Sequence, residues 1–212
     1  MFKEFTMRAE IIEELIGKKT IEHNINKMKF LQEHGYSGLE LKRTDEEIAK
    51  ILYDLSDMDD DFDLFLELSI FEQVLRSNLF VETYQSFELE FIHCCSNVAK
   101  KTHQLAVKNI NEKNTLIRCR EFLTKVAKIN IPADQLWKKI SGYYILRNCI
   151  VHSDAKVTND TWDFISDLFE AYPLLYYNNI DRRIYLLKGF CEEAIQNSDL
   201  FLKDICYQLG PS

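Results

Sequence analysis

The chain is poor in the residues that interrupt helices, with only Gly 6 and Pro 3 among 212 residues. Long helices are therefore favoured over tight turns. We find no alternating run of apolar and polar residues of the kind that a half-buried strand shows. No apolar run reaches about 18 residues, and charges interrupt the N-terminal segment where a signal peptide needs its apolar region. The sequence predicts an all-α, cytoplasmic protein without a membrane span.

Metal-ligand spacing is also missing. The cysteines include no Cys-x-x-Cys pair and lie mostly among apolar neighbours, as reduced core thiols do. The acidic run over residues 57–63 fails as a calcium loop, because Phe62 stands where glycine is needed and Leu68 where glutamate is needed. We therefore expect no metal and no cofactor. The six cysteines are Cys94, Cys95, Cys119, Cys149, Cys191 and Cys206.

Helical periodicity runs along most of the chain. We expect an N-terminal helical segment over residues 1–60, a helical core over 61–175 and C-terminal helices over 176–212 that pack on the core. The expected helices cover about 8–33, 44–55, 62–101, 112–128, 132–152, 160–171, 179–197 and 199–208.

Charge is distributed unevenly. The net charge is −8, yet the segment from Lys100 to Arg147 holds eleven basic and three acidic residues, so it carries +8 and the rest carries −16. A phosphate-binding surface has this signature. Solvated helix faces also gather charge, and the sequence leaves both readings open.

The sequence Arg147-Asn148-x-x-x-His152 near the end of a predicted helix carries the most chemistry. At about 100° per residue, Asn148 and His152 share one face, whereas Arg147 and His152 diverge by about 140°. One helix aims both side chains at the same phosphate only if Arg147 bends its long side chain round or the helix frays at His152. A two-fold dimer can instead bring residues of two copies into one cleft. The alternative is an ordinary helix end. There a histidine near the C-terminus interacts favourably with the helix dipole, and an arginine one turn earlier donates hydrogen bonds to the last carbonyls.

This motif resembles that of the HEPN superfamily of ribonuclease domains, in which Arg-polar-x-x-x-His ends a helix. The segment from Leu75 to Glu88 looks like the long helix that precedes the motif in defence-associated members. The segment from Trp137 to Asn148 is similar to their approach to the motif. The resemblance covers roughly residues 63–167 and implies a bundle of four to five core helices with extra terminal helices, and a homodimer.

The resemblance also implies metal-independent endonucleolytic cleavage of RNA. Arg147 and His152 would be the catalytic pair, and Asn148 would orient them. Histidine can move a proton of the 2′-hydroxyl or of the leaving 5′-oxygen, and arginine can hold the phosphate. The products would be a 2′,3′-cyclic phosphate and a 5′-hydroxyl. Lys138, Lys139 and Tyr144 are the expected RNA contacts, since lysine attracts phosphate and tyrosine stacks on bases.

Such an enzyme would be toxin-like or act in antiviral defence, under the control of an antitoxin or activating partner protein. Two alternatives stay open: a catalytically silent HEPN-like module that binds RNA or protein, and a helical adaptor unrelated to RNA. Two further side chains have structural expectations. Glu88 is expected to pair with Arg76 or Arg147 or to lie at an exposed edge, and His93 is expected in the core.

Overall fold

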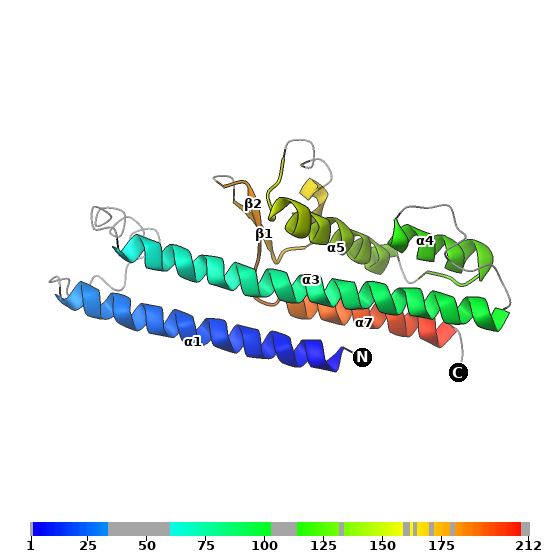
Figure 1. Cartoon of the computed structure of the whole chain (residues 1–212), viewed down its shortest axis with the longest axis horizontal. Coiled ribbons are helices and arrows are strands. Elements are labelled where there is room, and N and C mark those ends of the chain that lie inside the picture. Colours follow the sequence, from blue (N-terminus) through cyan, green and yellow to red (C-terminus); the bar gives the residue numbers. More distant parts are fainter. Residues whose placement is uncertain are drawn as a thin grey trace. The chain divides into compact units, whose positions relative to one another are not determined.

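The computed structural model describes residues 2–33, 60–102, 114–131, 134–158, 162, 165–169, 172–178 and 181–208 (Figure 1). The described chain is mostly helical. It divides into two compact units, one made of Met1–Ala9 with Arg76–Ser212 and the other of Glu10–Leu75. The expected boundaries lay at about residues 60 and 175, so the division within the long second helix was not anticipated.

Two long helices contribute to both units. They are α1 (Lys3–Glu33) and α3 (Asp60–Thr102), close to the helices predicted over 8–33 and 62–101. In the unit Glu10–Leu75, the Thr20 hydroxyl donates to the Ile16 carbonyl at 2.9 Å and lies 3.4 Å from a Glu72 carboxylate oxygen. The helix predicted over 44–55 lies outside the described residues.

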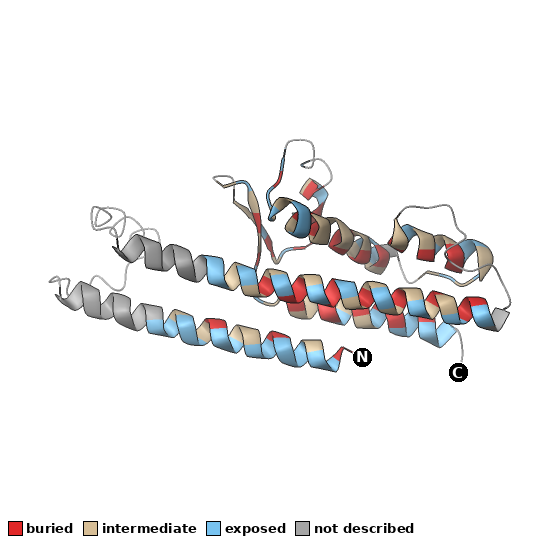
Figure 2. Cartoon of the chain, viewed as in Figure 1, coloured by how far each residue is buried: buried red, intermediate tan, exposed pale blue. Residues whose placement is uncertain are grey.

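Aromatic side chains form the core of the larger unit. Phe80 of α3 packs edge-on against Tyr143 of α5 (Asp134–Ser153), and Phe87 of α3 packs edge-on against Phe201 of α7 (Phe190–Gln208). Trp137 of α5 also contacts Phe201, so the three helices share one aromatic cluster. Buried positions recur along all three helices (Figure 2). This burial fixes α5, which carries the Arg–His motif, against α3 and α7.

A short helix begins at an asparagine cap. The Asn114 side chain accepts hydrogen bonds from the backbone of Leu116 at 2.9 Å and Ile117 at 3.2 Å, which starts α4 (Thr115–Glu121). A π-helical turn over Phe122–Val126 continues it. The helix predicted over 112–128 is therefore helical from Thr115 to Val126.

The helix predicted over 179–197 is wrong in its first part, and the mostly helical chain also contains a two-stranded sheet. β1 (Leu175–Asn178) pairs antiparallel with β2 (Arg183–Leu186), where a helix was expected from residue 179. Each strand has only four residues, too few for alternation to stand out from a helical pattern. In β2 the buried Ile184 and Leu186 do alternate with half-buried Arg183 and Tyr185.

The C-terminal region holds one helix, α7, where two were predicted. One predicted helix ended at about 197 and the next began at about 199, where the chain reads Asn197-Ser198-Asp199. Here the Asn197 amide donates to the Tyr143 hydroxyl at 2.8 Å, Ser198 is buried, and Asp199 pairs with Lys203. Because these side chains are engaged elsewhere, they do not compete with the helix backbone.

The hairpin holds the end of α5. Asp154 and Ala155 adopt left-handed conformations with φ of 53° and 57°, which stops the helix just after His152. The Ile184 amide then donates to the Ala155 carbonyl at 3.0 Å. Arg183 forms an ion pair with Asp154 at 2.5 Å. Backbone and side chain together therefore anchor this helix end to β2.

Four of the six cysteines are buried, as expected of core thiols, but Cys206 is exposed and Cys94 is half-buried. The sulfur atoms of Cys94 on α3 and Cys206 on α7 lie 3.8 Å apart. No helix in the described part of the chain is long and apolar enough to cross a membrane.

Candidate functional site

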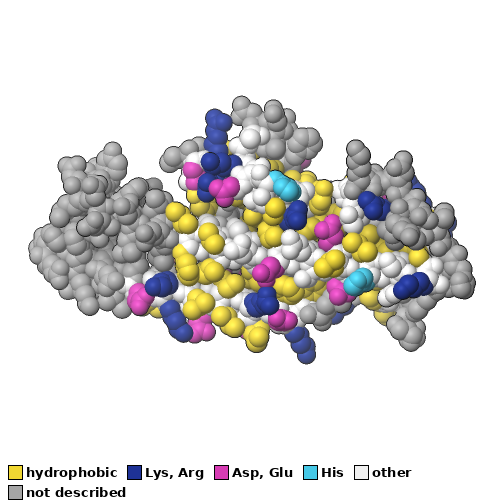
Figure 3. All heavy atoms as spheres, viewed as in Figure 1, with side chains coloured by type: hydrophobic (Ala, Val, Ile, Leu, Met, Phe, Trp, Pro, Cys, Tyr) yellow, Lys and Arg dark blue, Asp and Glu magenta, His cyan; other side chains and the backbone are white. Residues whose placement is uncertain are grey.

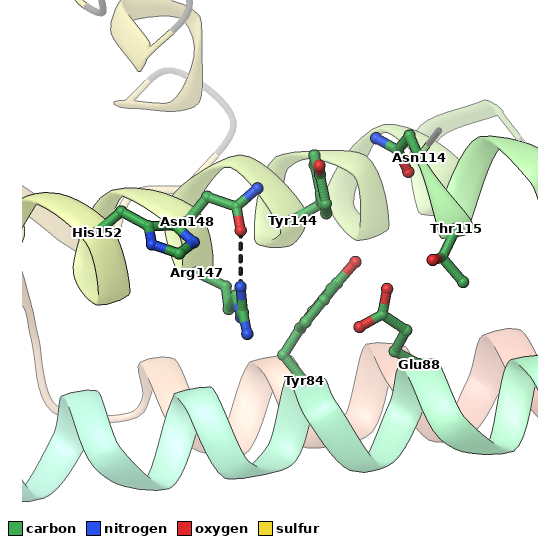
Figure 4. A pocket seen from close by; sticks show the side chains of 8 residues that line it. All are labelled: Tyr84, Glu88, Asn114, Thr115, Tyr144, Arg147, Asn148 and His152. Atoms are coloured by element: carbon green, nitrogen blue, oxygen red, sulfur yellow. Dashed lines mark hydrogen bonds between the residues drawn. The ribbon is translucent and has the colours of Figure 1, made fainter. Parts of the chain in front are cut away.

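The Arg–His motif faces a cleft in the larger unit, with a volume of about 380 Å³. Helix α5 supplies one side, α3 supplies the facing side, and the start of α4 closes one end (Figure 4). The lining residues are Tyr84, Glu88, Asn114, Thr115, Tyr144, Arg147, Asn148 and His152.

Arg147, Asn148 and His152 come together in this cleft within one chain. Asn148 and His152 follow one another by one helical turn on the same face, as the spacing predicted. Arg147 is half-buried, and its Nη1 donates to Asn148 Oδ1 at 2.9 Å. This bond turns the guanidinium toward the face that carries His152, which is exposed. Of the alternatives that the spacing left open, the structure has the bent Arg147 side chain within one chain. The homodimer stays a prediction.

Tyr84 of α3 forms the part of the cleft that faces α5. Its ring is buried and lies 6.4 Å from the Tyr144 ring, centroid to centroid. Burial raises the pKa of the Tyr84 hydroxyl far above its ordinary value, and the nearby Glu88 carboxylate raises it further. Among the described residues, neither this hydroxyl nor Arg147 Nε has a hydrogen-bond partner. A buried polar group without a hydrogen-bond partner costs about 1–3 kcal/mol of stability. A ligand that hydrogen-bonds to the Tyr84 hydroxyl or to Arg147 Nε would remove this cost.

Glu88 also lines the cleft, half-buried. Within the part of the chain that the structure describes, no hydrogen bond or ion pair joins Glu88 to Arg147, so the expected ion pair is not formed. The Tyr84 side chain lies between them (Figure 4). Arg76, the other expected partner, is buried and donates to the Leu186 carbonyl at 3.4 Å. The cleft therefore has a basic end at Arg147 and His152 and an acidic end at Glu88.

The expected RNA contacts separate into two groups. Tyr144 lines the cleft, whereas Lys138 and Lys139 do not. Lys139 forms an ion pair with Glu193 of α7, and Lys138 is exposed elsewhere on α5. On the face drawn in Figure 3, the described Lys and Arg side chains lie among Asp and Glu side chains and do not form one patch. Lys101, Lys108 and Lys113, which contribute to the predicted basic segment, have side chains outside the description.

Three residues of the cleft were not among the predicted site residues: Tyr84, Asn114 and Thr115. An Asn-Thr pair ahead of an apolar run is a helix-start signal, and it would have fixed where α4 begins. It could not have shown that this start lies beside α5. His93, expected in the core, is instead exposed on α3. Its neighbours Cys94 and Cys95 gave a misleading apolar context.

The donor set of the cleft suits organic and phosphate groups more than a metal ion. In the described residues, no three His, Cys, Asp or Glu side chains gather as metal ligands. Arginine and tyrosine can donate hydrogen bonds, and Glu88 can accept them.

Comparison with protein-family models, with curated proteins and with solved structures found no match to this chain.

Proposed function

We propose that this protein is a metal-independent endoribonuclease that cleaves RNA through its own 2′-hydroxyl, with Arg147 and His152 as catalytic residues. The observation that carries the proposal is the convergence of Arg147, Asn148 and His152 on one cleft. The resemblance of the motif to HEPN ribonucleases points in the same direction. A toxin-like or defence role, a homodimer and a controlling partner protein follow from that resemblance and belong to the proposal.

The chemistry requires a cation and a proton carrier, and the cleft holds both. Arg147 binds the scissile phosphate and stabilises the negative charge that develops on its oxygens. The 2′-oxygen forms a bond to phosphorus while the bond from phosphorus to the 5′-oxygen breaks. The 2′-hydroxyl loses a proton and the 5′-oxygen gains one. His152, exposed at the mouth of the cleft, carries one of these two protons and solvent carries the other.

Asn148 acts as a positioning residue. Its side-chain oxygen accepts one guanidinium hydrogen of Arg147, which leaves the other donors of the fork for phosphate oxygens. Electrostatic catalysis depends on such preorganisation, because a guanidinium held in place needs no reorientation during the reaction.

The test is cleavage of total cellular RNA by the purified protein in EDTA, beside Arg147→Ala and His152→Ala. His93→Ala is the matched control, since His93 is an exposed histidine that does not line the cleft. We expect cleavage by the wild type and the control, and a loss of at least about 100-fold in both cleft variants. Cleavage that persists in folded His152→Ala would overturn the assignment. Binding of RNA without cleavage would favour the silent binding module instead.

A further inference from the structure

The cleft has two chemically different ends, and the proposed cleavage uses only one. Arg147, Asn148 and His152 lie at the basic end, and Glu88 and Thr115 lie at the other, with Tyr84 between them (Figure 4). An RNA phosphate held at Arg147 leaves the acidic end for another part of the same nucleotide chain.

Glu88 determines what that part can be. An ionised carboxylate only accepts hydrogen bonds, and it repels phosphate. Among the described residues no ion pair occupies Glu88, so its oxygens are available to a ligand in this half-buried position. The group that fits there must donate hydrogen bonds and carry no negative charge, which excludes the RNA phosphates and leaves the ribose hydroxyls and the nucleobases. A nucleobase can offer two neighbouring donors to the two carboxylate oxygens, whereas a ribose 2′-hydroxyl offers one.

Tyr144 supplies a surface for a base. Its half-buried ring lines the cleft and is tilted by 51° from the Tyr84 ring, so the two rings are not stacked on each other. Proteins that read single-stranded RNA stack splayed bases on such rings and hydrogen-bond their Watson–Crick edges. Tyr144 lies one turn before Asn148 on α5, between the basic end and Glu88 (Figure 4).

The geometry points to guanine as the base that this end recognises. Two carboxylate oxygens accept two neighbouring N–H donors, and of the four bases only guanine presents such a pair, at N1 and N2. Adenine and cytosine present one amino group beside an acceptor nitrogen, and uracil presents one N–H between two carbonyls. The Thr115 hydroxyl at the same end is a donor for guanine O6.

We propose that Glu88 is a specificity-determining residue that binds the Watson–Crick edge of a guanine next to the scissile phosphate. The inference rests on the proposed ribonuclease function. The phosphate at Arg147 fixes the distance to the base, and Tyr144 holds the base plane.

One experiment uses oligodeoxythymidylates with a single ribonucleotide, so that only one bond can be cut. Guanine, hypoxanthine, adenine, cytosine and uracil are placed either on the ribose or on the following nucleotide. Hypoxanthine is the matched substrate, because it differs from guanine only by lacking the N2 amino group. We expect guanine to be cut about 10-fold faster than hypoxanthine at one of the two positions, the value of one hydrogen bond to a charged group.

The variant Glu88→Gln should reduce this ratio to about 2-fold or less while other substrates are still cut, because the amide no longer offers two acceptor oxygens. Glu90→Gln is the matched control, two residues along α3 and outside the cleft, and should retain the preference. Equal cleavage of guanine and hypoxanthine by the wild type overturns the inference, and so does a preference that survives in Glu88→Gln.

A binding measurement separates this inference from the proposed function. Guanosine 3′-monophosphate should bind the wild type about 10-fold tighter than inosine 3′-monophosphate by isothermal titration, and Glu88→Gln should remove the difference. Tighter binding of the guanosine nucleotide without cleavage of any RNA would overturn the ribonuclease and keep the guanine site. Cleavage of RNA together with equal binding of both nucleotides would keep the ribonuclease and overturn the guanine site. The wild-type comparison alone decides if Glu88→Gln does not fold.

Discussion

Gly142 tests whether α5 is held as closely as the structure indicates. A β-carbon at this position would lie 2.9 Å from both Leu168 Cδ2 and Tyr172 Cε2, and closer still to the Tyr172 hydroxyl. That hydroxyl donates to the Lys139 carbonyl on the preceding turn of α5. Glycine is therefore needed here for close approach, and Gly142→Ala must displace Tyr172 or move α5.

Three contributions set the change in the free energy of unfolding that Gly142→Ala causes. Overpacking costs about 1–3 kcal/mol, and loss of the Tyr172 hydrogen bond costs about 1 kcal/mol. The higher helix propensity of alanine offsets about 1 kcal/mol. We expect Gly142→Ala to lower the free energy of unfolding by about 1–3 kcal/mol, measured by urea denaturation followed by circular dichroism. Double substitution with Tyr172→Phe should cost less than the two single changes together.

Gly17→Ala is the matched control for this prediction. Gly17 lies in α1, and a β-carbon there would meet no atom within 4 Å. The same substitution should therefore raise stability by about 0.5–1 kcal/mol, through helix propensity alone. A Gly142→Ala protein as stable as the wild type would refute the close contact between α5 and Tyr172.

Three further predictions concern the residues around the cleft. Asn148→Ala should lower kcat by about 10- to 100-fold through misplacement of Arg147, and unchanged kcat would remove its positioning role. Lys139→Ala should lower the free energy of unfolding by about 1–2 kcal/mol in urea titrations, because Glu193 loses its cationic partner and, among the described residues, keeps only the Asn197 amide. Exposed Lys138→Ala should change it by less than about 0.5 kcal/mol. Burial raises the pKa of three tyrosine hydroxyls, so above about pH 10 the unfolded state loses these protons while the folded state keeps them. The free energy of unfolding should therefore be unaffected below about pH 10 and fall above it by about 1.4 kcal/mol per pH unit for each group. Urea titrations at increasing pH measure this fall. These hydroxyls belong to Tyr84, Tyr143 and Tyr172.

Long helices could be predicted because their signal accumulates over many residues. The absence of Gly and Pro from residue 62 to 101 gave α3, and Pro132 with Asp134 marked the start of α5. The hairpin over 175–186 could not be predicted in the same way. Its strands are stabilised by tertiary contacts, such as the Ile184 amide on the Ala155 carbonyl, which no local pattern reveals.

The site was predictable where it is local and not where it depends on packing. Spacing on one helix brought Tyr144, Asn148 and His152 to one face. Tyr84 and Glu88 reach the cleft only because α3 packs against α5, through contacts such as that between Phe80 and Tyr143. The same packing places the Tyr84 ring between Arg147 and Glu88, which prevents the ion pair that charge alone suggested.

The chemical groups at the cleaved ends report whether the 2′-hydroxyl attacks the phosphate. An oligonucleotide with one ribose, cut in EDTA, is analysed by mass spectrometry beside its 2′-deoxy counterpart. Attack by the 2′-hydroxyl should give a 2′,3′-cyclic phosphate and a 5′-hydroxyl from the ribose substrate, no cut in the deoxy one, and neither product with His152→Ala. Cleavage of the deoxy substrate, or a 5′-phosphate product, would contradict attack by the 2′-hydroxyl.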